Sequence, residues 1–377
     1  MYFSLMNYLL IPDKFKGSAT AEEVIESLIR GIQKVDRAAH FHKIIASDGG
    51  DGFLSSIAQF KQLQTINIPS KNAYLEPSDS CYLWDKKSKT AYIELANTAG
   101  IAHLNNRTLR ILDSSTIGVG IQLKDALDKG ATTIYMGLGG SATNDAGMGI
   151  LYAIGFKFYD QNNKELIPNS ANLDQIQKII PKAYPNTKFY IVNDVDNPLY
   201  GPKGAAAVYA PQKGATPAQV KKLDQSLEQL SKLIKRDFGI DEASTPGTGA
   251  AGAAAYGLKA FLNAAFIPGF EFLKDRAQLE QLISNENIDY IITGEGHFDE
   301  QSLYGKLIEG ILKLAKTYEV PSLIVCGVSS VEPKHLENYP IDSIIELKSK
   351  GRSLDYCLSN TKTLIEEEIH NYLKSKL

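Results

Sequence analysis

The stretch TTIYMGLGGSATND, residues 132–145, joins an apolar β-type run to a polar loop rich in glycine. The same order of strand and polar loop recurs at YLLIP (8–12), FHKIIASDGGDG (41–52), KFYIVNDVDNP (188–198), IDYIITGEGHFDEQS (288–302) and PSLIVCGVSS (321–330). Strands that alternate with helices are typical of α/β folds with largely parallel sheets. Ligands of such sheets bind at the carboxyl ends of the strands, where these polar loops are expected to lie.

The middle of the chain has a different composition. Residues 65–98 contain the β-rich runs TINIP, CYLWD and TAYIELA, and residues 201–257 are dominated by Gly and Ala. Because similar strand-loop units occur near both termini, we predict a discontinuous, doubly wound domain of the Rossmann or flavodoxin type, formed by residues 1–70 plus 285–377. A second α/β domain, residues 71–284, is inserted into it.

Two helices are predicted near the ends of the chain. Thr20 with Glu23 three residues on is a capping-box pattern, and an apolar helical face then continues to Val35. Residues 353–377 read as a closing amphipathic helix. Its predicted apolar face consists of Leu358, Leu364, Ile369 and Leu373.

Composition and charge limit the function classes. The 377 residues are 44% hydrophobic, and 40 Lys+Arg against 43 Asp+Glu leave a net charge of -3, so no global basic field recruits nucleic acid or membrane. Three cysteines without CxxC spacing are typical of a reducing cytosol, and the first apolar run is shorter than the ~20 residues of a membrane span. We expect a cytoplasmic protein that binds neither nucleic acid nor membrane; a homo-oligomer remains open.

The segment GLGGSATNDAGMG, residues 137–149, carries the strongest functional signal. Glycines allow a ligand to approach the backbone, and amides at a helix start, with the hydroxyls of Ser141 and Thr143, suit phosphate oxygens. The alternative is a tight turn that needs glycine for packing alone. A second alternative is a dinucleotide fingerprint, because Gly137, Gly139 and Ala142 fit G-x-G-x-x-A and Asp160 could hold a ribose.

Other motifs narrow the chemistry. No Walker-type G-x-x-x-x-G-K-[ST] and no protein-kinase signature occurs, so a phosphotransferase here would use another scaffold. Carboxylates in the polar loops could hold Mg²⁺ or accept a hydroxyl proton, although acidic loop residues are as often turn formers or caps. Lys14 and Lys16 could hold a small anion, and the histidines show no zinc spacing. The acidic candidates are Asp48, Asp51, Asp194, Asp196, Glu295 and Asp299.

Six motifs in order resemble the bacterial glycerate kinase family of type 1 over nearly the whole chain. They are PDKFKGS (12–18), DGGDGF (48–53), GLGGSATNDAG (137–147), DVDNPLYGPKGAAAVYAPQKGA (194–215), GTGAAG (247–252) and GEGHFDEQSLYGK (294–306). The resemblance implies ATP-dependent, Mg²⁺-assisted phosphorylation of D-glycerate, in a two-domain α/β fold with the active site in the cleft between the domains. It favours 2-phosphoglycerate as product, with 3-phosphoglycerate open.

The resemblance also assigns residues. Those matching the family pattern are Lys16, Asp48, Gly139, Gly140, Ser141, Asn144, Asp194, Asn197, Glu295, Asp299 and Lys306. We expect Asp194 to act on the hydroxyl proton, Lys16 to hold the carboxylate and Asp299 to assist. Asp48 and Glu295 are expected to hold Mg²⁺. The expected nucleotide-binding residues are Gly137, Gly139, Gly140, Ser141, Thr143, Asn144 and Lys306.

Three positions depart from the family pattern: Lys14 replaces a Ser, Ala146 replaces a second Gly, and His297 replaces an Arg or Lys. Any charge at His297 therefore depends on pH. Two other functions stay open, namely an NAD-dependent dehydrogenase of a small hydroxy acid and a non-catalytic nucleotide-binding protein.

Overall fold

The computed structural model describes residues 6–47, 49–104, 108–303, 307–348 and 351–376. The chain forms two compact units. Unit 1 comprises Met1–Ser47, Ser55–Phe60 and Gly269–Leu377, and unit 2 comprises Asp48–Leu54 and Lys61–Pro268. Both boundaries lie earlier than the predicted residues 70 and 284, because Gln64–Lys71 pairs within the sheet of unit 2 and the helices after residue 268 pack on the sheet of unit 1.

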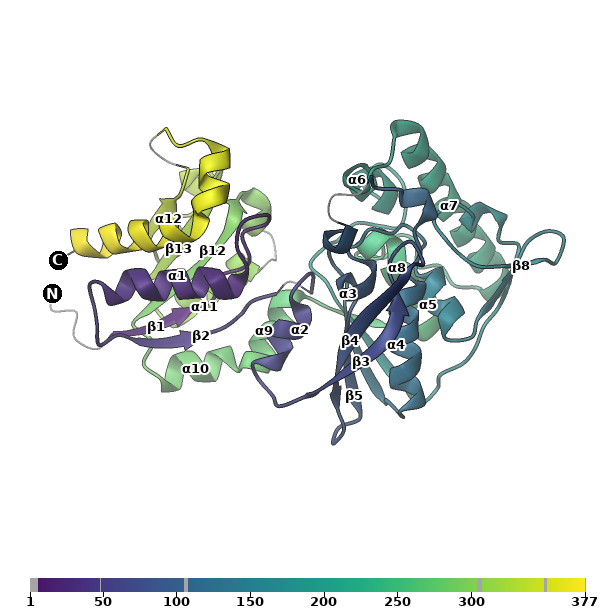
Figure 1. The fold of residues 1–377 in the computed structure, drawn as a ribbon, viewed down its shortest axis with the longest axis horizontal. Helices are drawn as coiled ribbons and strands as arrows, with labels where there is room; N and C mark the ends of the chain where they lie inside the picture. The colour runs from purple at the N-terminus through teal and green to yellow at the C-terminus, as the bar shows by residue number, and fades with distance from the viewer. Residues whose placement is uncertain (1–5, 48, 105–107, 304–306, 349–350, 377) are drawn as a thin grey trace. The chain divides into compact units, whose positions relative to one another are not determined.

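Unit 1 contains a five-stranded parallel sheet (Figure 1). Its strands are β1 (Asn7–Leu10), β2 (His40–Lys43), β12 (Tyr290–Phe298), β13 (Ser322–Ser329) and β14 (Ile341–Glu346). The spatial order β14-β13-β12-β1-β2 is the flavodoxin-like order, with the strand order reversing between β1 and β12. The predicted α/β, doubly wound class is confirmed.

Helices cover both faces of this sheet because β1 buries alternate side chains on opposite sides. Leu10 packs into one core with α1 (Ala21–Gln33) and α12 (Leu354–Ser375). Leu9 packs into a second core with the helices α9 (Gly269–Ala277), α10 (Leu279–Asn285) and α11 (Leu307–Thr317). A further helix, α2 (Phe53–Ala58), begins in the residues of unit 2 and ends in those of unit 1.

The two predicted helices are present. Thr20 and Glu23 form the predicted capping box at the start of α1. In α12, Leu364, Ile369 and Leu373 are buried, but Leu358 is 40% exposed, so its predicted core position is wrong. A non-helical residue in the first half of α12 interrupts the helical period and turns Leu358 out of the apolar face.

Unit 2 contains a mixed six-stranded sheet in the order β11-β10-β6-β5-β4-β3. The strands are β3 (Gln64–Lys71), β4 (Pro77–Asp85), β5 (Thr90–Glu94), β6 (Thr133–Gly137), β10 (Lys188–Val192) and β11 (Ala265–Ile267). The strands β5, β6, β10 and β11 are parallel, and β3 and β4 extend the sheet antiparallel. A small antiparallel sheet is formed by β7 (Lys157–Tyr159), β8 (Glu165–Leu166) and β9 (Lys178–Ile180).

The helices of unit 2 share one large apolar core with the six-stranded sheet. They are α3 (Ala96–Ala99), α4 (Ile117–Asp128), α5 (Met148–Ala153), α6 (Ala205–Tyr209), α7 (Pro217–Phe238) and α8 (Ala250–Leu262). Within the described part of the chain, no helix has the length and apolar character that a membrane crossing requires.

Candidate active site

The parallel strands of unit 2 end at the same level. Glu94 at the end of β5 and Val192 at the end of β10 both pair with Gly137, the last residue of β6. The loops that follow these strands therefore begin side by side at the carboxyl edge of the sheet. Loop 138–147 lies between the other two, which is the position that the sequence predicted for the functional loop.

Loop 138–147 packs closely against residues 49–54. A Cβ on Gly139 would lie 2.4 Å from the Cα of Gly50, and one on Gly140 would lie 2.3 Å from Oδ1 of Asp51. Gly140 also has a φ of +63°, which disfavours a side chain. The carboxylate of Glu94 accepts from the amides of Gly52 at 3.2 Å and Leu54 at 3.0 Å, and so fixes the second loop to the end of β5.

The amides of loop 138–147 divide into two groups. Within the described residues, those of Gly139, Gly140 and Ser141 have no acceptor. The amides of Gly147 and Gly149, expected to be free at the helix start, donate instead to Asp145 at 3.1 and 3.2 Å. Asp145 therefore occupies the amides at the start of α5, and the amides available to a ligand lie at the glycine end of the loop.

Asp145 is fully buried and anchors the loop. Its Oδ2 accepts from the amide of Thr116 at 2.7 Å and from the hydroxyl of the same residue at 2.8 Å, and Ser115 adds a longer contact at 3.3 Å. Burial raises the pKa of Asp145, while these donors favour its ionised form. Sequence reasoning placed Asp145 in the motif but assigned it no role.

A second buried charge, Lys213, was missed by the sequence analysis. It is 3% exposed, and its Nζ donates to Oγ of Ser141 and to the carbonyl oxygen of Thr143, each at 2.8 Å. Burial lowers the pKa of Lys213 to about 7. The only sequence signal is its place in the glycine-rich run 201–215.

Several polar atoms of this edge are buried without a hydrogen-bond partner among the described residues: Oγ1 of Thr143, both amide atoms of Asn144 and Nδ2 of Asn193. Asp194, the expected base, is half-buried and directly follows Asn193 after the end of β10. Asn197 stabilises the same loop, because its Nδ2 donates to the carbonyl oxygen of Lys203 at 2.8 Å and its Oδ1 accepts from the hydroxyl of Tyr209 at 2.6 Å.

The glycine-rich run 247–257 supports loop 138–147 from the start of α8. Ala251, Gly252 and Ala253 all have left-handed backbone angles there. A Cβ on Gly252 would lie 1.8 Å from the carbonyl oxygen of Thr143, so only glycine fits. The amide of Ala146 donates to the carbonyl of Gly252 at 3.2 Å, and Ala146 itself has a φ of +54°, which explains why a glycine would be the easier residue at this position.

In unit 1, the predicted residues lie where the strand order reverses. The amide of Asp13, after β1, donates to the carbonyl of Gly294 in β12 at 2.8 Å. A Cβ on Gly296 would lie 3.4 Å from the amide nitrogen of Lys16. The exposed Lys16 and the half-buried Glu295 thus come from neighbouring strand ends.

Two further polar residues of this edge, Asp299 and His297, make local contacts. Asp299 accepts from the amide of Ser302 at 3.2 Å, which makes it the cap of the short 3₁₀ turn Glu300–Leu303. His297 contacts Oγ of Ser330 through Nε2 at 3.1 Å.

The predicted site residues therefore fall into two groups. Unit 1 holds Lys16, Glu295 and Asp299, and unit 2 holds Asp194 and the nucleotide-binding residues from Gly137 to Asn144. Asp48 and Lys306 lie outside the described residues. The described residues contain no group of three His, Cys, Asp or Glu side chains that could hold a metal. Mg²⁺ in phosphotransferases usually needs only one or two carboxylates beside phosphate oxygens and water, so Glu295 fits that ion.

Asp160 does not lie where the dinucleotide alternative needs a ribose-binding acid. Asp160 follows β7 in the small antiparallel sheet, away from the parallel strands that flank β6. Its Oδ1 accepts from the amides of Asn162 at 2.8 Å and Lys164 at 2.9 Å, and so closes the turn between β7 and β8. A ribose-binding acid belongs at the carboxyl edge of the parallel sheet instead.

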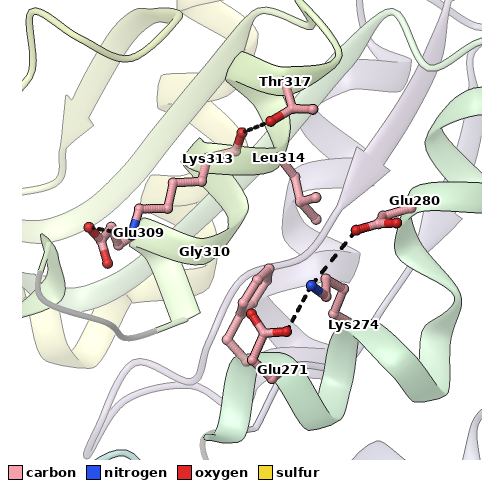
Figure 2. A pocket seen from close by; sticks show the side chains of 9 residues that line it. Glu271, Lys274, Glu280, Glu309, Gly310, Lys313, Leu314 and Thr317 are labelled. Carbon is pink, nitrogen blue, oxygen red and sulfur yellow. Dashed lines mark hydrogen bonds and ion pairs between the residues drawn. The ribbon is translucent and has the colours of Figure 1, made fainter.

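A hollow of about 320 Å³ in unit 1 is lined by helices α9, α10 and α11 (Figure 2). Lys274 there lies between Glu271 at 2.7 Å and Glu280 at 3.7 Å, and Lys313 pairs with Glu309 at 2.9 Å. Because these charges pair with one another and none lies at a strand end, the hollow is a weaker candidate than the carboxyl edges.

Comparison with known proteins decides the family. The model of the glycerate kinase family matches residues 8–375. The chain belongs to the glycerate kinase family. It is 35% identical to the glycerate kinase of Halalkalibacterium halodurans over 97% of each chain, and 31% identical to the glycerate 2-kinase of Escherichia coli K12 over 93% of this chain and 92% of that one.

A solved structure of this family has the same fold. A protein of Salmonella typhimurium LT2, named as a glycerate kinase 2, superposes with a TM-score of 0.79 at 28% identity, covering 99% of this chain and 98% of that one. Membership of the family makes the chain a kinase that acts on a small molecule.

Proposed function

We propose that this protein transfers the γ-phosphoryl group of ATP to a hydroxyl of D-glycerate, with 2-phosphoglycerate as the product. The observation that carries the proposal is the glycine end of loop 138–147, which follows a parallel strand in a chain of this family. Three consecutive amides there have no acceptor among the described residues. Phosphate oxygens accept from such amides, and catalysis of phosphoryl transfer consists mainly of positioning and charge stabilisation.

The residue roles are proposed unit by unit. In unit 2, the loop from Gly137 to Asn144 binds the nucleotide phosphates, and Asp194 accepts or orients the proton of the attacking hydroxyl. The side-chain amide of Asn144, which is buried in that loop and has no partner among the described residues, is available to a phosphate or substrate oxygen. In unit 1, Lys16 pairs with the glycerate carboxylate.

The remaining expected residues are proposed to hold Mg²⁺, to contact phosphate or to fix the loop that carries Glu295. Mg²⁺, when bound, neutralises the developing charge on the phosphoryl oxygens. Glu295 is proposed to hold it, with Asp48 as the second carboxylate and Lys306 as a phosphate contact. Asp299 is proposed to fix the turn that follows Glu295, because it caps that turn.

A coupled ADP-release assay tests the proposal. Mg·ATP is supplied with D-glycerate, with L-glycerate and without acceptor, and ³¹P NMR identifies the phosphorylated position. We expect turnover with D-glycerate and very slow ATP hydrolysis without acceptor. Hydride transfer to NAD with a hydroxy acid, or nucleotide binding without turnover of any acceptor, would replace the proposal by one of the two alternatives.

A further inference from the structure

Lys213 is a buried cation that has no anionic partner among the residues that the structure describes. Its two acceptors, Oγ of Ser141 and the carbonyl oxygen of Thr143, are both neutral. An ammonium group has three donors, and no carboxylate of the described residues lies within 4.0 Å of this one. Taking an ammonium group out of water costs several kcal/mol, so proteins rarely bury one alone.

The carboxylate that acts electrostatically on Lys213, that of Asp145, already accepts hydrogen bonds from other groups. Asp145 is the one charged group that acts electrostatically on Lys213 among the described residues. Its carboxylate accepts from Thr116, Gly147 and Gly149, and it makes no ion pair with the lysine. Asp145 therefore offsets only part of the cost of burying the ammonium.

The loop that Lys213 holds has unused hydrogen-bonding groups. The amides of Gly139, Gly140 and Ser141 have no acceptor, and both amide atoms of the fully buried Asn144 have no partner, in the described part of the chain. The loop's free amides and unpartnered side-chain amide, together with the buried cation that holds the loop, form the donor set of an anion site.

We infer that Lys213 is a positioning residue for an anionic oxygen bound by loop 138–147: it fixes Ser141 and Thr143 and supplies the positive charge beneath that oxygen. The inference rests on the proposed function, which supplies two sources of such an oxygen, a phosphoryl group of the nucleotide and the carboxylate of glycerate. The phosphoryl group is the favoured source, because its oxygens can accept from several consecutive backbone amides.

The first experiment compares Lys213→Met with Lys221→Met, which removes an exposed lysine on α7. Calorimetry gives the Kd of ATP, ADP and adenosine with Mg²⁺ present, and initial rates give the KM of D-glycerate. We expect Lys213→Met to weaken ATP and ADP binding about 10-fold or more and to leave adenosine unchanged, as expected for loss of a charged contact. A rise confined to the KM of glycerate would assign the site to the carboxylate.

Two results overturn the inference. Equal Kd and KM values in Lys213→Met and the wild type would show that the charge is not used. An equal loss of affinity for adenosine would show that the substitution distorts the whole nucleotide site. If the wild type turns over D-glycerate while either result is found, the proposed function survives; if the wild type binds no nucleotide and no glycerate, both fail.

A second measurement needs no variant. Burial lowers the pKa of Lys213 to about 7, so at pH 8 most of the free protein carries a neutral amine there. An anion bound nearby favours the ammonium form, and binding must then take up a proton. Calorimetry of Mg·ADP at pH 8, in buffers of different ionisation enthalpy, is expected to show an uptake that disappears below pH 6. Zero uptake at pH 8 would contradict the inference even if Lys213→Met does not fold.

Discussion

The carboxyl edges of the parallel strands in the two units differ in how far the protein satisfies its own polar groups. In unit 2, Asp145 and Lys213 are buried and hold loop 138–147 through hydrogen bonds. In unit 1, Lys16 is exposed, and the side chain of His297 is 59% exposed. The first edge is organised before any ligand binds, whereas the second presents long side chains whose ordering a ligand must stabilise.

The largest expected effect tests the edge of unit 2. Asp194→Asn should lower kcat about 10²–10⁴-fold and leave the Kd of Mg·ATP nearly unchanged, because an amide cannot accept the hydroxyl proton. Steady-state rates and calorimetry measure the two quantities. An unchanged kcat would exclude Asp194 as the base. An equal loss in Asp196→Asn would point to the net charge of the loop instead.

A matched pair of glycines tests whether the fold itself sets the shape of loop 138–147. Gly252 and Gly239 have similar φ values, +64° and +70°, so an added Cβ has a similar backbone cost of about 1 kcal/mol at both. Only at Gly252 would that Cβ meet a backbone oxygen, at 1.8 Å, and nothing lies within 4 Å of one on Gly239.

We therefore expect Gly252→Ala to lose about 1–3 kcal/mol more unfolding free energy than Gly239→Ala, and to weaken nucleotide binding as well. Urea unfolding and calorimetry of Mg·ATP measure both effects. Equal losses in the two variants would mean that the close contact with Thr143 does not constrain the loop.

The edge of unit 1 should respond differently. Lys16→Met is expected to raise the KM of glycerate about 10–100-fold. That factor corresponds to the loss of one charge-assisted hydrogen bond, worth about 1.5–3 kcal/mol. The thermal midpoint should stay within experimental error, because the side chain is exposed and makes no hydrogen bond or ion pair with the described residues. Lys316→Met, at an exposed site on α11, is the comparator. An unchanged KM would remove Lys16 from substrate binding.

The same contrast explains what the sequence could predict. Local patterns identify the parallel strands, the capping box at Thr20 and the polar loops, because hydrophobic period and cap chemistry act within a few residues. The position of loop 138–147 at a strand end follows from the same patterns. Free amides at Gly139 to Ser141 could be expected from the glycines alone.

Other features depend on contacts between distant residues. Lys213 and Ser141 are 72 residues apart, and Asp145 and Thr116 are 29 apart, so nothing local distinguishes these side chains from surface charges. The same limit applies to Asp160, which closes a turn, and to Leu358, which a helix interruption exposes. The fold class was therefore predictable, whereas the charges that organise the site were not.

The pH dependence of stability in the absence of ligand should reflect the buried Lys213 of unit 2. Burial lowers the pKa of Lys213 from 10.5 to about 7. Between these values the unfolded chain binds a proton that the folded chain lacks, so stability rises with pH, by at most about 1.4 kcal/mol per pH unit. Lys213→Met lacks this contribution, while Lys221→Met retains it.

Urea unfolding of the three proteins at pH 7, 8 and 9 measures the slopes, and changes common to all three cancel in the differences. We expect the wild type and Lys221→Met to gain stability relative to Lys213→Met as the pH rises. Parallel slopes would mean that Lys213 keeps its proton in the folded protein throughout this range. A protonated Lys213 would then need an anionic partner even without ligand. In that case the residues of unit 2 would organise their own carboxyl edge less completely than the comparison with unit 1 assumes.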